Sequence, residues 1–91
     1  MFYVYLLQSQ KDGNFYIGQT NDTNTRVARH NSGFVQSTKN KIPWILIGFE
    51  EYPTRREATW REYNLKKKIS EKKRFIQKLI SLRFHSSMDR V

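Results

Sequence analysis

Two tyrosines, Tyr5 and Tyr16, are the first candidates for chemistry, because each lies in a short segment rich in aromatic and branched side chains. A phenol hydroxyl can transfer a proton or orient a water molecule. The structural alternative is as strong, since tyrosine is favoured in strands, where its ring covers the core and its hydroxyl meets water. Gly18 follows Tyr16 by two residues and would permit the close approach of another backbone or of a ligand.

Arg26 and His30 are the second candidate, since a separation of four residues places both on one face of a helix. Two cations at that spacing repel each other unless an anion lies between them, which makes the pair a candidate for binding phosphate. The alternative is a solvated polar face on which His30 is neutral.

Glu62 is the third candidate. In a helix that begins after Thr54, the residues Ala58, Glu62, Leu65 and Ile69 share one face. The helical phase therefore turns Glu62 toward the core, in a segment otherwise crowded with lysine and arginine. A buried carboxylate is costly unless it is paired or binds a metal, so an ion pair or a hydrogen bond to tyrosine is the structural alternative to a metal site.

Together these side chains are the parts that metal-assisted hydrolysis of a phosphodiester requires. A carboxylate holds a divalent ion that polarises the phosphate, a tyrosine or histidine takes a proton from water, and an arginine meets the developing charge. The sequence has no glycine-rich phosphate loop, no nucleophile elbow, and no second acidic residue near Glu62 for a two-metal site. With no cysteine and only two histidines, a structural zinc site is excluded as well.

The elements that must position these residues follow from local patterns. Residues 2–7 and 15–18 are predicted strands, joined by turn chemistry at 11–14 into an antiparallel hairpin. Residues 23–31 are predicted to form a short polar helix, capped by Asp22 or Thr20.

The second half of the chain supplies one more strand and two longer helices. Residues 34–43 are predicted to be a loop, and the apolar run at 44–49 is predicted to be the strand at the sheet centre. Thr54 and Glu57 fit a capping box that starts a helix.

The last helix is predicted to be capped by Ser70. Its inward stripe consists of Phe75, Ile76, Leu79 and Ile80, with Leu82 as a further member. Residues 84–91 have no periodicity and are predicted to be a disordered tail, so the predicted domain covers 1–83.

The charge of this chain points to a polyanionic partner. Its 91 residues carry a net charge of +9, and the charge is uneven. Residues 1–54 hold 5 basic and 4 acidic groups, whereas residues 55–91 hold 12 and 4. Nucleic acid is the commonest such partner, with anionic lipid or a merely solubilising surface as alternatives. The predicted nucleic-acid contacts are Arg29, Lys39, Lys41, Lys66, Lys67, Lys68, Lys72, Lys73 and Arg74.

The lack of cysteine, and the lack of any apolar stretch near the ~20 residues of a membrane span, predict a cytoplasmic protein without membrane contact.

The ordered set of motifs resembles the GIY-YIG nuclease family, in particular its small stand-alone bacterial members. Tyr3-Val4-Tyr5 stands at the place of GIY, Tyr16-Ile17-Gly18 is the YIG motif, and Arg26 with His30 matches the R-x-x-x-H helix. Further elements that look like this branch are His30-Asn31-Ser32-Gly33, Pro43-Trp44, Glu50-Glu51, Ala58-x-x-x-Glu62 and Leu65-Lys66-Lys67. The resemblance covers about residues 2–82.

The resemblance implies an α+β fold, with a three-stranded antiparallel sheet flanked by about three helices, and a site where these residues converge. By analogy with the family, Tyr16 is the base or water-orienting group, Glu62 the lone ligand of Mg²⁺ or Mn²⁺, and Arg26 the phosphate clamp. Tyr5 becomes an orienting partner, and His30 stays open as an alternative base.

The expected activity is that of a metal-dependent DNA endonuclease, structure-selective or weakly sequence-selective, serving repair or recombination. Cleavage of RNA and a protein partner both stay open. Many family nucleases use an asparagine after the metal-binding glutamate. Here the only later one, Asn64, lies about 200° round the helix from Glu62. A non-catalytic nucleic-acid-binding module that keeps the fold is therefore the alternative.

Overall fold

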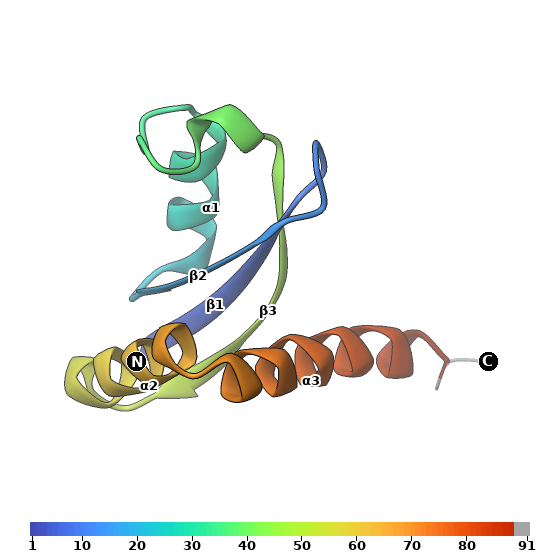
Figure 1. Ribbon diagram of the computed structural model, residues 1–91. Coiled ribbons are helices and arrows are strands. Elements are labelled where there is room, and N and C mark those ends of the chain that lie inside the picture. The colour runs from blue at the N-terminus through green and yellow to red at the C-terminus, as the bar shows by residue number, and fades with distance from the viewer. Residues whose placement is uncertain (89–91) are drawn as a thin grey trace.

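Three antiparallel strands and three helices make up the fold of this protein (Figure 1). The computed structural model describes the backbone of residues 1–88 and the side chains of residues 1–83. The elements are β1 (Phe2–Ser9), β2 (Phe15–Thr20), α1 (Thr23–Asn31), the 3₁₀ helix η1 (Lys39–Lys41), β3 (Trp44–Tyr52), α2 (Arg55–Lys67) and α3 (Ile69–Met88). This arrangement confirms the predicted α+β fold.

The strand at the sheet centre is β1, with β2 and β3 on either side of it. The prediction that the apolar run at 44–49 forms the centre was wrong. Four consecutive residues of β1, from Val4 to Leu7, are at most 2% exposed, whereas Phe49 of β3 is 39% exposed. A central strand is covered on both faces, and in this chain the N-terminal run is the one covered on both.

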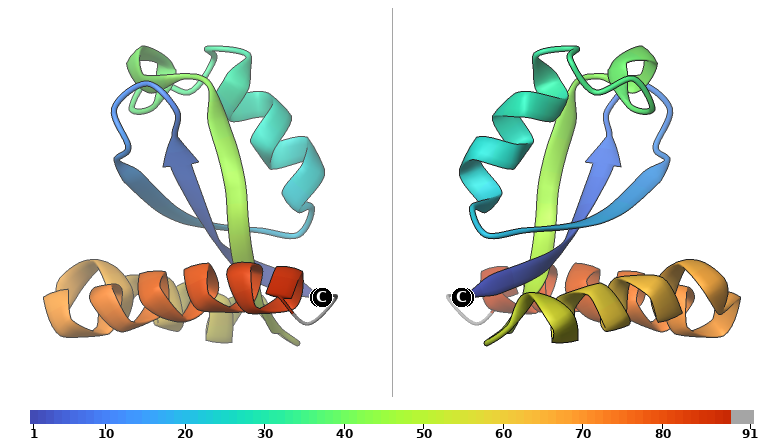
Figure 2. Two further views of the ribbon diagram at one scale, coloured as in Figure 1. Left: turned by 90° about the vertical axis from the view of Figure 1, so that its right-hand side faces the viewer. Right: turned by 90° about the vertical axis from the view of Figure 1, so that its left-hand side faces the viewer.

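Successive side chains of β1 enter two separate cores, since side chains alternate across a strand. Val4 and Leu6 join the core beneath α2 and α3, and Tyr5 and Leu7 join a smaller cluster on the other face. Figure 2 shows α1 on one side of the sheet and the α2–α3 pair on the other. The candidate tyrosines therefore lie on the α1 side.

Local sequence signals explain where the first elements begin. The Asp22 carboxylate accepts a hydrogen bond from the Thr25 backbone amide at 3.1 Å, so Asp22 is the N-cap of α1. Half of the predicted capping box of α2 is present: the Glu57 amide donates to the Thr54 hydroxyl at 3.2 Å, and this hydroxyl, in place of the Thr54 amide, donates to the Glu57 carboxylate at 3.0 Å. Gly13 has a φ of 80°, which the hairpin turn requires of it.

The junction between α2 and α3 differs from the prediction. Lys68 has extended backbone angles, so α2 ends there and α3 begins at Ile69. Ile69 was predicted to face the core but is 74% exposed, because the break removes it from the helical phase of α2. Ser70 lies inside the first turn of α3 and Leu82 is 56% exposed, while Phe75 and Leu79 are buried as predicted.

Helix α3 extends to Met88, so the predicted domain boundary at residue 83 falls inside it. The predicted tail at 84–91 thus begins within this helix, and its last residues, 89–91, lie outside the described residues. No helix in the described part is long and apolar enough to cross a membrane.

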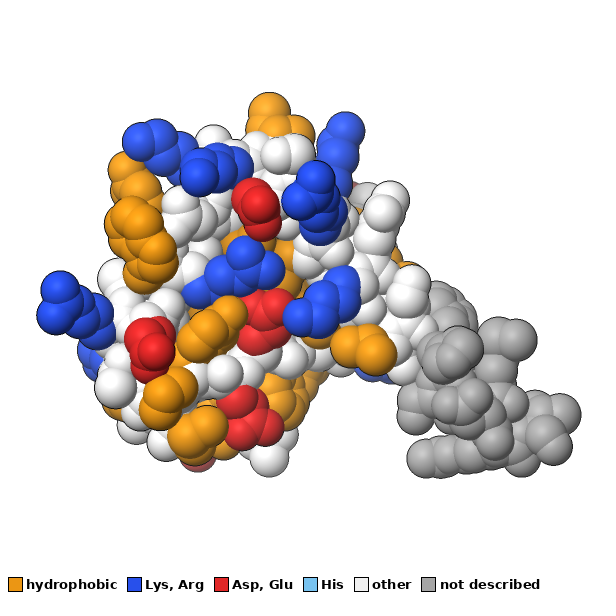
Figure 3. Space-filling model, turned by 90° about the horizontal axis from the view of Figure 1, so that it is seen from below, with side chains coloured by type: hydrophobic (Ala, Val, Ile, Leu, Met, Phe, Trp, Pro, Cys, Tyr) orange, Lys and Arg blue, Asp and Glu red, His pale blue; other side chains and the backbone are white. Residues whose placement is uncertain are grey.

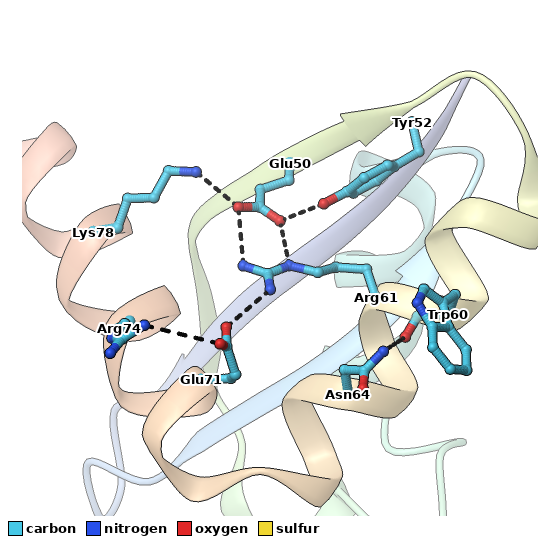
Figure 4. A network of polar contacts seen from close by, with 8 residues as sticks. All are labelled: Glu50, Tyr52, Trp60, Arg61, Asn64, Glu71, Arg74 and Lys78. Carbon is cyan, nitrogen blue, oxygen red and sulfur yellow. Dashed lines mark hydrogen bonds and ion pairs between the residues drawn. The ribbon is translucent and has the colours of Figure 1, made fainter.

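A polar network fixes the two long helices to β3 (Figure 4). The Glu50 carboxylate, whose side chain is 13% exposed, accepts hydrogen bonds from Arg61 at 3.0 Å, Lys78 at 2.7 Å and Tyr52 at 2.7 Å. Arg61 also pairs with Glu71 at 3.4 Å. One carboxylate thus joins a strand, α2 and α3.

This network makes the free energy of unfolding depend on pH. Burial alone would raise the pKa of Glu50, but its hydrogen bonds from Arg61, Lys78 and Tyr52 outweigh that effect and hold the pKa at about 2. A carboxyl with a depressed folded-state pKa stabilises the fold above its unfolded pKa of about 4.5, and this stabilisation is lost as the pH falls toward 2.

We expect the contribution to be on the order of 3 kcal/mol. Thermal unfolding followed by circular dichroism from about pH 6 down to about pH 2.5 should show it. The Glu50→Gln variant should be less stable near neutral pH and should lose less stability in acid. If both proteins lose stability in parallel, Glu50 does not carry this effect.

Candidate active site

Three rings from three elements meet on the α1 side of the sheet. Tyr5 of β1 and Tyr16 of β2 have centroids 6.4 Å apart. The His30 ring of α1 lies 5.9 Å from Tyr5 and 5.0 Å from Tyr16, edge-on to both. The structure therefore brings together residues of three motifs that are separated in sequence.

A chain of hydrogen bonds fixes the tautomer of His30. The Tyr5 hydroxyl lies 3.0 Å from Nε2 of His30, and the Thr38 hydroxyl lies 2.9 Å from Nδ1. Because Thr38 donates its own proton to the Val35 carbonyl at 3.4 Å, it accepts from Nδ1–H of His30. Nε2 then carries no proton and accepts the hydrogen bond of Tyr5.

His30 is buried and neutral. Burial lowers the pKa of His30, and the positive charges of Arg26 and Arg29 lower it further. The predicted repulsion between two stacked cations on α1 is thus avoided through a neutral imidazole. With both ring nitrogens engaged, His30 holds Tyr5 in place.

Tyr5 is kept as a neutral phenol. Burial raises the pKa of Tyr5 above its ordinary value, the Tyr16 hydroxyl and the Glu62 carboxylate raise it too, and Arg26 lowers it. The charges of Arg26 and Glu62 therefore act on the same hydroxyl, although one residue lies on α1 and the other on α2.

Gly18 provides the room that the Tyr5 ring occupies. The two residues are directly paired across β1 and β2. A Cβ atom at position 18 would lie 2.7 Å from Cζ of Tyr5, far closer than real contacts allow. The close approach expected at Gly18 exists, but a neighbouring side chain makes it, and neither a backbone nor a ligand.

Tyr16 is the more accessible of the two tyrosines. Its ring is half-buried against Trp44 at 6.2 Å and against His30. Within the described residues its hydroxyl has no hydrogen-bond partner, whereas the Tyr5 hydroxyl is bound to His30. Tyr16 thus presents a phenol that can act on a ligand.

Glu62 reaches this site from α2, beside the buried Ala58 and Leu65. Its side chain is 20% exposed, and its carboxylate forms an ion pair with Lys66 at 2.8 Å. The Lys66 ammonium lies 5.4 Å from the Tyr16 ring centroid. Since α2 packs on the opposite face of the sheet, this side chain must pass the outer edge of β2.

Lys66 was predicted to point to solvent as a nucleic-acid contact, and its side chain is 50% exposed, although its ammonium also pairs with Glu62. A glutamate and a lysine four residues apart on a helix are neighbours, and here the pair turns Lys66 to the site.

The donor set fits a single hard cation. No cluster of three or more histidine, cysteine or acidic side chains occurs among the described residues, and Glu62 is the carboxylate whose charge acts on Tyr5. Mg²⁺ is commonly held by one or two carboxylates, with water and substrate phosphate completing its shell. Glu62 could supply that one ligand once Lys66 yields the carboxylate oxygen.

Arg26 is half-buried on α1, one turn before His30. No ion pair joins it to an acidic side chain within the described part of the chain. Its charge nonetheless influences both Tyr5 and His30. A guanidinium with no acidic partner among the described residues suits an anionic ligand.

The remaining predicted nucleic-acid contacts lie on the surface, apart from this site. Lys41 pairs with Asp12 at 3.6 Å, and Arg74 lies 3.9 Å from Glu71. The other predicted contacts are exposed: Arg29, Lys39, Lys67, Lys68, Lys72 and Lys73. Figure 3 shows that basic side chains are spread over the α2–α3 face with acidic ones between them.

Sequence reasoning missed Thr38, and it named Asn31 and Trp44 as parts of motifs without giving their contacts. Asn31 holds the Trp44 backbone through two hydrogen bonds of 2.9 and 2.6 Å, and the Trp44 indole donates to the Thr38 carbonyl at 3.0 Å. These bonds fix the loop that places Thr38 against His30. A lone threonine in a polar loop gives no sequence signal for such a role.

Comparisons with known proteins agree with this geometry. Residues 1–75 match the GIY-YIG catalytic domain. The chain is 41% identical over 68 residues to the UPF0213 protein CPE1444 of Clostridium perfringens, covering 74% of this chain and 72% of that protein. It is 35% identical over 82 residues to the UPF0213 protein BH0048 of Halalkalibacterium halodurans, covering 89% and 83%.

A solved structure has the same fold. The solution NMR structure of the UPF0213 protein BH0048 from Bacillus halodurans superposes with a TM-score of 0.52 at 33% identity, covering 87% of this chain and 85% of that one. Both the matched motifs and the shared fold lead to one conclusion: this chain belongs to the GIY-YIG catalytic domain family, together with the small bacterial UPF0213 proteins.

Proposed function

We propose that this protein is a metal-dependent endonuclease that hydrolyses DNA phosphodiester bonds. One observation carries the proposal. The accessible Tyr16 hydroxyl shares its site with the Arg26 guanidinium and the Glu62 carboxylate, and among the described residues Arg26 has no acidic partner. Membership of the GIY-YIG family supports the same reaction class.

Each residue of the site has a distinct part in this proposal. Arg26 binds the phosphate and meets the charge that develops on its oxygens. Tyr16 orients the attacking water and, in its phenolate form, is the group placed to take its proton and become a phenol. Glu62 would hold Mg²⁺ or Mn²⁺, which supplies Lewis-acid polarisation of the phosphate when bound.

Tyr5 and His30 position these groups. Because Nε2 of His30 accepts from Tyr5, its lone pair is not free to act on water. We therefore assign the role of base to Tyr16, which the sequence left open between Tyr16 and His30. The buried chain Tyr5–His30–Thr38 keeps the floor of the site rigid.

The basic surface supports a nucleic-acid substrate. Exposed lysines and arginines gain little within the protein but release counterions when they neutralise phosphates. A chain this small lacks a groove-reading element, so weak sequence selectivity or structure selectivity is expected. The relatives are bacterial, and such an activity would serve repair or recombination in the cytoplasm, where bacterial DNA lies.

A non-catalytic binding module is the alternative, and one observation favours it. The side chain of Asn64 donates to the Trp60 carbonyl at 2.9 Å, as Figure 4 shows, and is not among the residues that meet at Tyr16. The amide that often assists the metal-binding glutamate in this family is thus not supplied by Asn64.

Cleavage of supercoiled plasmid separates the two functions. Nicked circles are expected with Mg²⁺ or Mn²⁺ and none with a chelator, because the proposed reaction needs the ion. Linear, branched and RNA substrates should be assayed in parallel. Binding without cleavage of any substrate in either metal would reject the nuclease and leave the binding module.

A further inference from the structure

Two large aromatic side chains on α2 lie open to solvent. Trp60 is 66% exposed and Tyr63 is 52% exposed. Their rings are stacked, with centroids 5.9 Å apart and planes only 18° from parallel. Aromatic rings that face water in this way commonly mark a binding surface.

Cations surround this pair. The Lys67 ammonium lies 5.3 Å from the Tyr63 ring centroid and 3.1 Å from its hydroxyl. Trp60 and Tyr63 line an open groove that is also lined by Arg55, Arg56, Lys67 and Lys68. No acidic residue is among the described residues that line this groove.

A neighbouring hollow does not share the excess of positive charge that lines the groove. The hollow on the other side of Trp60 is lined by Glu57 and Glu71 together with Arg61 and Lys68. Its charges are balanced, whereas the groove at Tyr63 is uniformly basic. In Figure 3, hydrophobic side chains lie exposed on the α2 side of the molecule, next to Lys and Arg side chains.

We propose that this groove binds an unpaired nucleobase of a nucleic-acid strand, with the base stacked on the aromatic pair and its phosphates held by the flanking cations. Flat aromatic faces bind bases of any identity, and a cationic rim binds the backbone. A base inside a duplex has no free face to offer. The groove therefore selects single-stranded segments.

The groove lies next to the proposed active site along α2, and in this respect the inference rests on the proposed function. Trp60 and Tyr63 lie within two residues of Glu62, so with a rise of about 1.5 Å per residue they are close to it along the helix axis, although they are turned about 200° and 100° round the helix from it. Thr59, which lines the groove, accepts a hydrogen bond of 2.6 Å from Gln19 of β2, the strand that carries Tyr16. The substrate class is then DNA with unpaired bases next to the cleaved bond.

Binding measured in a chelator tests this site without any cleavage. The probes are an oligothymidine, an abasic strand of the same length, and a duplex. Of the two tryptophans, Trp44 is buried and Trp60 is exposed, so quenching of intrinsic fluorescence reports on Trp60. We expect the parent to bind oligothymidine at least ~10-fold more tightly than the abasic strand.

The double variant Trp60→Ala with Tyr63→Ala should lose this preference and should bind duplex as the parent does. The conservative Trp60→Phe variant should keep most of the preference for oligothymidine, which separates the effect of stacking from loss of the fold. Because these variants lack Trp60, their binding is measured by the anisotropy of labelled strands. As a matched control, Lys72→Glu with Lys73→Glu should weaken binding to all three probes alike and flatten its salt dependence.

An equal affinity of the parent for oligothymidine and abasic strand would overturn the proposal. So would a double variant that binds every probe as the parent does, since the pair would then serve another partner, such as an apolar protein segment. Because binding is measured without metal, its result does not depend on cleavage. Stacking in this assay, combined with no cleavage in the plasmid assay with Mg²⁺ or Mn²⁺, would reject the nuclease and leave this binding site standing.

Discussion

The Glu62→Gln variant is expected to lose metal-dependent cleavage by about 1000-fold or more, because it removes the one carboxylate that could hold a divalent ion there. The amide has nearly the same shape, so the fold and the affinity for DNA should persist. The ion pair with Lys66 is also lost, but a single i,i+4 pair of this kind contributes only about 0.3–0.5 kcal/mol.

Glu51→Gln is the matched control, since this carboxylate is exposed near the end of β3 and is paired with Tyr3, and not with Tyr5, across β1 and β3. Single-turnover cleavage, thermal unfolding and DNA binding in a chelator should be compared for both variants. A Glu62→Gln protein that cleaves at the parental rate rejects the metal assignment. One that unfolds would mean that the pairing with Lys66 is structural.

Removing the Tyr16 hydroxyl should be the next most damaging change. Tyr16→Phe deletes one oxygen that has no partner within the described residues, so stability should be unchanged. If this hydroxyl orients water and takes its proton, the rate of the chemical step should fall by about 100-fold or more.

Tyr5→Phe deletes the same atom from the other tyrosine and is the natural comparison. It leaves Nε2 of buried His30 without a donor, which should cost about 1–3 kcal/mol of stability. In Tyr5→Phe the cleavage rate and the free energy of unfolding should therefore both fall. In Tyr16→Phe only the cleavage rate should fall. An unchanged rate in Tyr16→Phe would return the role of base to His30.

Much of the fold could be predicted because its signals are local. The capping residues Asp22 and Thr54 are short-range features, and the helix predicted at 23–31 has the bounds of α1. The order of the strands is not local, since the apolar run at 44–49 is compatible with an edge or a centre. The break at Lys68 that exposes Ile69 likewise had no clear sequence signal.

The sequence indicated which residues form the candidate site better than it indicated the contacts between them. Motif order indicated the tyrosines, Arg26, His30 and Glu62, and the structure brings them to one edge of the sheet. Their roles stay predictions. The bonds of Thr38 and the contact of Lys66 with the Tyr16 ring depend on how a loop and a helix meet the edge of β2, which spacing alone does not encode.

The room that Gly18 leaves for Tyr5 has a consequence for how such sequences can change over time. Gly18 has no positive φ, so its backbone would accept other residues, and only the phenol above it forbids them. A substitution at position 18 is thus tolerable only after position 5 has become smaller. The tyrosine at position 5 therefore depends on the glycine at position 18, and a change at position 5 has to precede a change at position 18.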